Sequence, residues 1–419
     1  MTVKALNQDC LCTTLDADAL QAAWREGVGS DAEASAFFAP YGVYLERAQV
    51  DALLEAVAAL QRVTHLPAYA EAVAAEQGLA LPRYGTQGVC MGYDFHFDGA
   101  TPRLIEINTN AGGMLLNALL LAHQRICCDR MQGFSADVFR GAEPGRRLLD
   151  MFRAEWTAAG RRGEPQRIAL VDAQPAQQFL HPEFLLFKKM FEAAGWQVVI
   201  CDPEELARDS GRLLAQGLPV DLVYNRLTDF ALLEPAHARL REAWLAGDCV
   251  LTPDPWHHAL QADKRNLVHL ADAAWLAAHG ASAEDRRLLA QIVPPTQRVQ
   301  AANADELWAR RKQLFFKPRR GFGSRAAYRG DKLTKSVWAD IVASQDYVAQ
   351  AYAPPGTRRV RIDGELQEMK FDIRCYAYRG EILLLAARVY QGQTTNMRTR
   401  GGGFAPVFAP ALPAWRRVG

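Results

Sequence analysis

The sequence lacks the features that would tie the protein to a membrane or to nucleic acid. It has no apolar stretch long enough to cross a bilayer, and its first residues, MTVKALNQD, lack the apolar core of a secretory leader. Lys and Arg number 48 against 47 Asp and Glu, and no run of basic residues creates a broad positive field. We therefore expect a cytoplasmic protein with no membrane partner and no nucleic-acid partner.

Recognisable cysteine motifs are also missing. The eight cysteines are scattered, and the close pairs are Cys10-x-Cys12 and Cys127-Cys128. Neither pair has a second pair beside it at the spacing of a zinc site. A reducing compartment keeps such thiols free. We expect free cysteines and no structural metal.

The composition is that of a globular protein with more than one unit. Hydrophobic residues make up 49% and charged residues 23% of the chain, which are ordinary values. At 419 residues the chain is too long for one ordinary core, so two or three structural units are expected. There is no internal repeat.

Hydrophobic spacing predicts a helical N-terminal region. Residues 15–80 are mostly helical in pattern, most clearly where Val50, Leu53 and Val57 recur at the spacing of one helix face. From Tyr93 the period changes to two, which predicts a β-hairpin, followed by a helix over 113–128. The helical stripe is typical of core packing.

The middle of the chain has the pattern of an open α/β unit. Strands are predicted at 167–171, 196–201 and 221–224, with a helix over 182–194. Strands that alternate with helices form parallel sheets, whose ligands bind at the carboxyl ends of the strands. No Gly-x-Gly-x-x-Gly follows the first strand, so a dinucleotide site is not indicated.

The last part returns to strands after an Ala-rich helical stretch. Strands are predicted at 315–317, 347–350, 371–378 and 382–390. The tail beyond Phe408 contains Pro and Arg and is expected to be loose.

Glu106-Ile107-Asn108 is the first candidate site. Alternation on a strand places Glu106 and Asn108 on one face. With a three-residue turn at 99–101, Asp94 lies opposite Glu106, so the two carboxylates could share a cation. Magnesium favours one or two carboxylates plus substrate phosphates. The alternative is a solvated acidic hairpin face.

The second candidate site is the segment 316–324. Lys317 ends an apolar strand, and the glycine-containing loop that follows reaches Ser324. A point charge and free backbone N–H groups suit phosphate binding. Arg319 and Arg320 are expected to face solvent. The alternative is a basic hairpin turn.

The third candidate site lies on the late strands. Asp372 and Arg374 share a strand face. A three-residue turn at 379–381 would place Arg388 opposite Asp372, whereas a two-residue turn would send it to the other face. With the downstream Asn396, these groups suit the charge that develops in phosphoryl transfer. Surface salt bridging is the alternative.

Together these segments resemble the ATP-grasp superfamily, which has a Lys-Pro glycine loop, a hinge strand, an Asp-x-Arg strand, an Arg, an Asn with glycines, and a Glu-x-Asn strand. The Glu-x-Asn strand comes last in most members. Here it comes first, as in the circularly permuted branch that includes eukaryotic glutathione synthetase and the glutathionylspermidine synthetase domain. The resemblance covers about residues 85–125 and 165–408.

The resemblance implies an α/β protein, with an α+β ATP-binding part and a Rossmann-like substrate domain. Residues 85–130 would be the permuted metal-binding hairpin and helix, 150–255 the Rossmann-like domain, and 256–410 the lid and catalytic sheet. Residues 1–84 form an N-terminal helical region that the resemblance does not explain.

The resemblance also implies roles for individual residues. The nucleotide-binding residues would be Lys264, Lys317, Gly321, Gly323, Ser324 and Gln350. The magnesium ligands would be Asp94, Glu106 and Asn108. The groups that stabilise the transferred phosphoryl would be Arg374, Arg388 and Asn396. Ala351 stands where the hinge often has a Glu, so the ribose contact is unassigned.

The activity implied is that of an ATP- and magnesium-dependent ligase, which activates a carboxylate as an acyl-phosphate for attack by an amine or thiol. Its partners would be small-molecule or peptide substrates, and a homodimer is compatible with the sequence. A small-molecule kinase and a non-catalytic nucleotide-binding protein remain alternatives. No catalytic nucleophile is needed, so the cysteines and His96 are interpreted as packing or solvated residues. Specificity resides in loops without a recognisable code.

Overall fold

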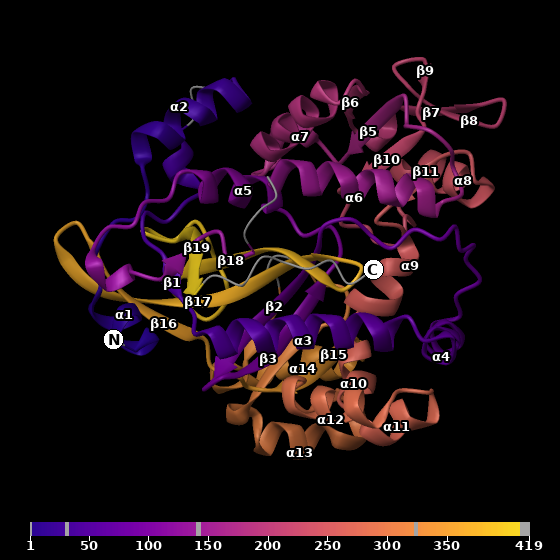
Figure 1. The fold of residues 1–419 in the computed structure, drawn as a ribbon. Coiled ribbons are helices and arrows are strands. Elements are labelled where there is room, and N and C mark those ends of the chain that lie inside the picture. The colour runs from indigo at the N-terminus through magenta and orange to yellow at the C-terminus, as the bar shows by residue number, and fades with distance from the viewer. Residues whose placement is uncertain (1, 30–32, 140–143, 322–325, 411–419) are drawn as a thin grey trace.

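The computed structural model describes residues 2–29, 33–139, 144–321 and 326–410 (Figure 1). Over these ranges the chain is a mixed α/β protein with one large sheet, two four-stranded sheets and a small three-stranded sheet. The predicted α/β class is therefore confirmed. None of the described helices combines the length and the apolar character needed to span a bilayer.

The large sheet forms the centre of the molecule. Its strands, in spatial order, are β1 (Val43–Tyr44), β19 (Gly403–Pro410), β18 (Glu381–Tyr390), β17 (Glu365–Tyr378), β2 (Met91–Asp98) and β3 (Thr101–Asn108). Two further strands extend it, β16 (Gly356–Ile362) beside β17 and β4 (Phe134–Ser135) beside β19. The early hairpin β2–β3 thus lies in one sheet with the late strands β17 and β18, directly beside β17, as the sequence predicted.

Helices cover both faces of this sheet (Figure 1). Helix α3 (Arg47–Thr64) lies on one face, and α5 (Met114–Ala122) and α6 (Pro144–Ala158) lie on the other. Alternation along β17 explains the division, because Ile373 and Cys375 pack in the core that contains α3, whereas Tyr376 packs with α5. Asp372 and Arg374 belong to the same face as Tyr376, so the chemistry of β17 is on the α5 side.

Both central hairpins combine a two-residue turn with a β-bulge. In β2–β3, Asp98 pairs with Thr101, and the register shifts between Asp94 and Phe95, so that Asp94 pairs with Glu106. A bulge adds one residue to one strand and so returns later side chains to the opposite face. The predicted three-residue turn at 99–101 is therefore wrong, but the pairing deduced from it is correct.

The hairpin β17–β18 shows the same compensation. Tyr378 pairs with Glu381 across a two-residue turn, and the register shifts between Tyr376 and Ala377. Asp372 consequently pairs with Arg388. A two-residue turn alone would have separated these side chains, and the bulge reunites them on one face.

The middle segment forms the expected parallel sheet. Its spatial order is β11 (Val250–Thr252), β10 (Leu222–Asn225), β5 (Arg167–Val171) and β6 (Gln197–Cys201). Helices α7 (His181–Ala193) and α8 (Ala238–Ala246) pack against it, together with α6. A small sheet, not predicted, is inserted after β6 and consists of β7 (Leu206–Asp209), β8 (Arg212–Ala215) and β9 (Leu218–Pro219).

A second four-stranded sheet lies on the β3 side of the large sheet. Its strands are β12 (Thr296–Arg298), β15 (Tyr347–Ala351), β13 (Leu314–Pro318) and β14 (Tyr328–Arg329). Helices α13 (Ala304–Ala309) and α14 (Lys335–Ser344) flank it. The core of this unit includes Leu307, Phe316 and Ile341.

The predicted Ala-rich helix before this sheet is broken into pieces. They are α9 (Pro255–His257), the π-helix η6 (His258–Ala262), α10 (Asn266–Leu270) and α11 (Ala273–Ala278). A further helix, α12 (Ala283–Ile292), follows beyond the predicted end at about residue 279. Short 3-10 helices occur at Ala34–Ala36, Asp129–Met131, Pro175–Gln177, Pro203–Glu205, Pro235–His237, Ala301–Asn303, Arg311–Gln313 and Gly330–Lys332.

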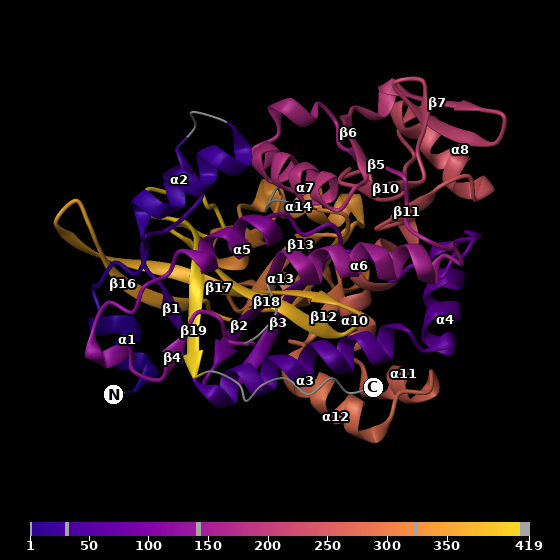
Figure 2. The same ribbon diagram turned by 45° about the horizontal axis from the view of Figure 1, so that its top comes forward.

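The N-terminal region is helical, as predicted, and is built into the central core. Its helices are α1 (Val3–Asp9), α2 (Ala17–Val28), α3 and α4 (Pro67–Gln77). Strand β1 pairs in parallel with β19, so residues near opposite ends of the chain lie side by side (Figure 2). Strand β19 also contains Ala409 and Pro410, which the sequence assigned to a loose tail; the rest of that tail lies outside the described residues.

Candidate active site

A buried network of charged side chains crosses the large sheet on its α5 face. Arg374 and Asp94 pair across β17 and β2, with Nε to Oδ1 and Nη2 to Oδ2 distances of 2.7 Å each. Arg388 Nη2 donates to Asp94 Oδ2 at 2.7 Å, and its Nε donates to Asp372 Oδ1 at 2.7 Å. Both guanidinium groups are therefore fixed in one orientation by charge-assisted hydrogen bonds.

The network explains the protonation of its members. Burial opposes the charge of Asp94, but the adjacent Arg374 and Arg388 hold the pKa of its carboxyl well below the usual range. Burial likewise opposes the charge of Arg388, but Asp372 and Asp94 raise its pKa. Asp94, Arg374 and Arg388 are thus ionised at neutral pH.

Asp94 does not have the environment of a magnesium ligand. It is fully buried, both of its oxygens accept from guanidinium groups, and Asn108 Nδ2 donates to Oδ2 at 3.0 Å. A divalent cation beside Asp94 would lie against two positive charges, Arg374 and Arg388, in a region of low dielectric constant. These contacts do not support the predicted role of Asp94 as a magnesium ligand, because both of its oxygens already accept hydrogen bonds from the two arginines.

A cavity opens between the large sheet and the second four-stranded sheet. It contains about 810 Å³ of space between atoms, including the part open to solvent. Its charged lining residues are Glu106, Lys264, Lys317, Lys370, Asp372 and Arg388. Its walls also include Phe315, Ala351, Tyr352, Pro355 and Tyr390. Four cations and two carboxylates therefore surround a space with a partly apolar wall.

Lys317 is the most deeply placed cation of the cavity. Its side chain is almost fully buried, and Nζ donates to Gln350 Oε1 at 2.7 Å and to the Ile105 carbonyl oxygen at 2.5 Å. Burial lowers the pKa of Lys317 to about 8, although nearby Glu106 opposes this shift. Lys317 thus connects the two sheets and presents a charge that is easily lost as the pH rises.

Lys264 approaches the cavity from the segment after η6. Its Nζ donates to the Gly321 carbonyl oxygen at 2.7 Å and lies 3.5 Å from Glu106 Oε2. The side chain of Glu106 is 25% exposed, so this carboxylate faces the open space. Gly323 and Ser324, the other members of the predicted phosphate loop, lie outside the described residues.

Arg319 departs from the expectation that it faces solvent. Its Nε donates to Asp263 Oδ2 at 2.8 Å, and its side chain is only 21% exposed. Asp263 also accepts from Arg265, and the Arg319 carbonyl oxygen accepts from the Lys264 backbone N–H at 3.3 Å. The start of the loop is therefore tied to the segment that carries Lys264, whereas Arg320 is exposed as predicted.

The structure brings six of the predicted site residues to the cavity and leaves others outside its lining. Those that line it are Glu106, Lys264, Lys317, Gly321, Gln350 and Arg388. Asn108 and Arg374 belong to the hydrogen-bond network around Asp94. Asn396 is exposed and accepts from the Arg398 backbone N–H at 3.1 Å in a turn, so its position does not support the predicted catalytic role.

Several lining residues were given no individual role by the resemblance. Asp372 accepts from Thr395 Oγ1 at 2.7 Å, and both residues line the cavity. Lys370 is two positions before Asp372 on β17, so strand alternation could have indicated it. His96 also lines the cavity, and its Nδ1 lies 2.7 Å from the Ala353 carbonyl oxygen.

A second polar cluster joins the parallel sheet to the start of α5. The Glu183 carboxylate accepts from the backbone N–H groups of Gly113 at 2.9 Å and Leu115 at 3.0 Å, which caps the helix. Arg226, directly after β10, lies 3.6 Å from Glu183. Burial raises the pKa of Asp172, directly after β5, to about 6. Charged groups thus gather where the parallel strands end.

Comparison with known proteins identifies the fold. At the level of sequence, no family model and no curated protein matches the chain. Among solved structures, a glutathione synthetase-like effector from Globodera pallida is similar over 94% of this chain and 96% of its own length, with a TM-score of 0.56 and 10% identity. The chain has the ATP-grasp fold.

Other solved structures are more distantly similar. A protein from Methylobacillus flagellatus KT, provisionally described as a gamma-glutamylcysteine synthetase, has a TM-score of 0.43 and 11% identity over 82% of both chains. A D-cycloserine synthetase has a TM-score of 0.32 and 20% identity over 54% of this chain and 76% of its own.

Proposed function

We propose that the protein is an ATP- and magnesium-dependent ligase that joins a carboxylate to an amine or a thiol through an acyl-phosphate. The observation that carries the proposal is the cavity between the two sheets, where four cations face two carboxylates. Such a charge pattern suits a polyphosphate accompanied by a divalent cation, because the cations neutralise phosphate oxygens and the carboxylates hold the metal. The ATP-grasp fold supports the same function.

The nucleotide would occupy the side of the cavity formed by β13 and β15. Lys317 and Lys264 would contact the phosphates, and Gly321 would contribute to the loop over them. Gln350 lies at the end of β15, beside Lys317, and would mark the adenine end. Phe315 and Tyr352 supply apolar surface for a base.

Magnesium would be held by Glu106 and Asp372, with Asn108 beside them. Glu106 and Asp372 line the cavity on the face of β3 and β17, and oxygen donors of this kind suit magnesium. Asp372 would take the place that the sequence gave to Asp94, because it lines the cavity and only its Oδ1 accepts from an arginine, whereas its Oδ2 accepts from the neutral Thr395 hydroxyl. When bound, the metal would neutralise charge on the phosphate oxygens. The position of the Glu106 hairpin beside β17 supports a circularly permuted arrangement.

The chemistry requires positioning more than covalent catalysis by the protein. A substrate carboxylate oxygen would attack the terminal phosphorus of ATP, the bond to the bridging oxygen would break, and ADP would leave. The amine or thiol would then attack the acyl carbon, releasing inorganic phosphate and a proton. Arg388, fixed by Asp94 and Asp372, would stabilise the charge on the phosphoryl oxygens.

The acid substrate would enter from the side of the parallel sheet. Arg226 and Asp172 follow the strands β10 and β5, at the edge where ligands of such sheets bind. The Nε of Arg226 is buried without a hydrogen-bond partner among the described residues. A substrate carboxylate would satisfy this donor.

The test is incubation with ATP, magnesium and pooled amino acids, polyamines and small peptides. Release of inorganic phosphate, together with a new mass equal to acid plus nucleophile less water, would establish the ligase. Accumulation of a stable phosphorylated substrate would indicate a kinase, and nucleotide binding without turnover would indicate a non-catalytic protein. The Lys317→Ala variant serves as the inactive control.

A further inference from the structure

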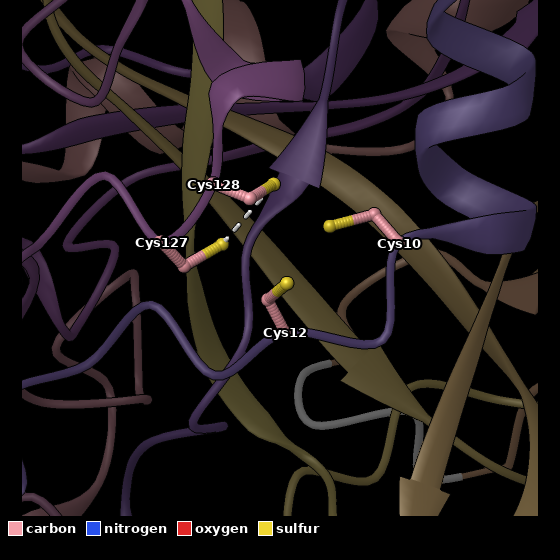
Figure 3. A group of neighbouring side chains, drawn as sticks. All are labelled: Cys10, Cys12, Cys127 and Cys128. Atoms are coloured by element: carbon pink, nitrogen blue, oxygen red, sulfur yellow. Dashed lines mark hydrogen bonds between the residues drawn. The ribbon is translucent and has the colours of Figure 1, made fainter.

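Four cysteines that are far apart in the sequence meet at the edge of the large sheet. The Sγ atoms of Cys10, Cys12, Cys127 and Cys128 all lie within 4.8 Å of one another, and their side chains converge on a common centre (Figure 3). Cys10 directly follows α1, and Cys128 directly precedes the 3-10 helix Asp129–Met131. The cluster therefore joins two chain segments that the sequence alone gave no reason to connect.

The spacing of the sulfur atoms fits a tetrahedral thiolate site. Zinc binds thiolate sulfur at about 2.3 Å, which places the sulfurs of a tetrahedral site about 3.8 Å apart. The Cys127 and Cys128 sulfurs are 3.9 Å apart, and closing the whole cluster around an ion needs a contraction of up to about 1 Å from the 4.8 Å limit. A disulfide would explain two sulfurs but not the approach of all four.

A buried positive charge beside the cluster gives an independent indication. Arg358 is fully buried, and its guanidinium donates to the carbonyl oxygens of Gly42 at 2.9 Å, Asn7 at 2.9 Å and Cys10 at 2.5 Å. No carboxylate lies within ion-pair distance of Arg358 in the part of the chain that the structure describes. Buried charges normally have a partner of opposite sign, and one is missing here.

We propose that Cys10, Cys12, Cys127 and Cys128 bind one zinc ion as a closed structural site. Four thiolates and one divalent cation carry a net charge of about −2, which supplies the missing counter-charge for Arg358. Four protein ligands leave no open position, as in structural zinc sites and unlike catalytic ones. The ion would fasten α1 to the segment that leads into β4, at the edge opposite the nucleotide cavity.

The site is independent of the proposed ligase activity, so its test measures metal and stability. The full chain would be purified under reducing conditions without added metal and analysed by inductively coupled plasma mass spectrometry. We expect about one zinc per chain. Replacement by cobalt should produce sulfur-to-cobalt charge-transfer absorption and the intense visible bands of a tetrahedral site. Removal of the ion by a chelator should lower the melting temperature, and zinc should restore it.

Variants locate the ligands. Cys12→Ser and Cys127→Ser should lose the bound zinc, whereas Cys201→Ala, at a buried cysteine outside the cluster, should keep it. If these variants fold poorly, the metal content and the cobalt spectrum of the unaltered chain still decide the question. Zinc-free protein under reducing conditions, iron in place of zinc, or zinc retained by both ligand variants would overturn the proposal.

Discussion

Asp94 and Arg374 face each other across β2 and β17 and are joined by two parallel hydrogen bonds of 2.7 Å. The pair has no access to solvent on the Asp94 side, and a second guanidinium, that of Arg388, shares the carboxylate. Both oxygens of this expected metal ligand therefore accept hydrogen bonds from arginines. The assignment of roles within the site follows from it, because the carboxylates that remain at the cavity are Glu106 and Asp372.

The first prediction concerns Lys317. Lys317→Ala should weaken ATP binding and reduce turnover by roughly 30- to 1,000-fold, equivalent to about 2 to 4 kcal/mol, as for the loss of one preorganised charged donor. Lys317→Arg should recover little, because the planar guanidinium cannot replace a compact ammonium bonded to Gln350. Nucleotide affinity and single-turnover rates measure the effect.

The neighbouring arginines provide the control for this prediction. Arg320→Ala should be close to wild type because its side chain is exposed. Arg319→Ala should have an intermediate effect, since Arg319 holds the loop to Asp263. An Arg320 variant as damaged as Lys317→Ala would show that the phosphates lie elsewhere.

A second prediction is a pH dependence of nucleotide binding by the free protein. The pKa of Lys317 is about 8, so its charge is present below this pH and is lost above it. The dissociation constant for ATP should therefore increase by up to about tenfold per pH unit above pH 8. Calorimetric titrations between pH 7 and 9.5 measure it, and Lys317→Met should remove this dependence.

The same shift has a consequence for stability. The folded-state pKa of Lys317, about 8, lies below its ordinary value of 10.5. Burial of the charged lysine therefore destabilises the folded state. This cost is at its full size below pH 8, decreases between pH 8 and 10.5, and is absent at higher pH. Lys317→Met should thus keep or raise the melting temperature at pH 7 while strongly reducing activity. A lower melting temperature would contradict this account.

A third prediction concerns the proposed magnesium ligands. Glu106→Gln, Asn108→Ala and Asp372→Asn should each reduce magnesium-dependent turnover by more than about 100-fold, because charge on the transferred phosphate is no longer neutralised. Titration of magnesium at fixed ATP measures this. Glu368→Gln, an exposed carboxylate on β17, is the matched control. Unchanged magnesium dependence in the Asp372 variant would remove it from the metal site.

The fourth prediction is that Asp94 acts mainly on stability and arginine position. Asp94→Asn should destabilise the protein by about 3 to 5 kcal/mol, because two buried guanidinium groups lose their shared counter-ion. Its pKa is held low by those arginines, so its contribution is present at neutral pH and declines as acid titrates the carboxyl. Urea unfolding measures the change, with Asp98→Asn, exposed on the same strand, as control. A loss below about 1 kcal/mol would indicate that the arginines are held by other contacts.

The sequence determined the type of several main elements, and six of the residues that line the cavity were named from it. Strand alternation placed Asp372 and Arg374 on one face, and the apolar strand ending in Lys317 was correctly identified. These features depend on local periodicity, which a folded sheet must respect because one face is buried.

Only the tertiary structure decided which charged groups meet. The bulges that restore the Asp94–Glu106 and Asp372–Arg388 pairs depend on how the hairpins pack in the sheet, not on the turn residues. Two arginines donate hydrogen bonds to Asp94, and Cys10 lies close to Cys127. Both arrangements depend on contacts between distant segments of the chain. Sequence periodicity specifies the face on which a side chain lies, whereas the packing of distant elements specifies its partner, and the partner decides the chemistry.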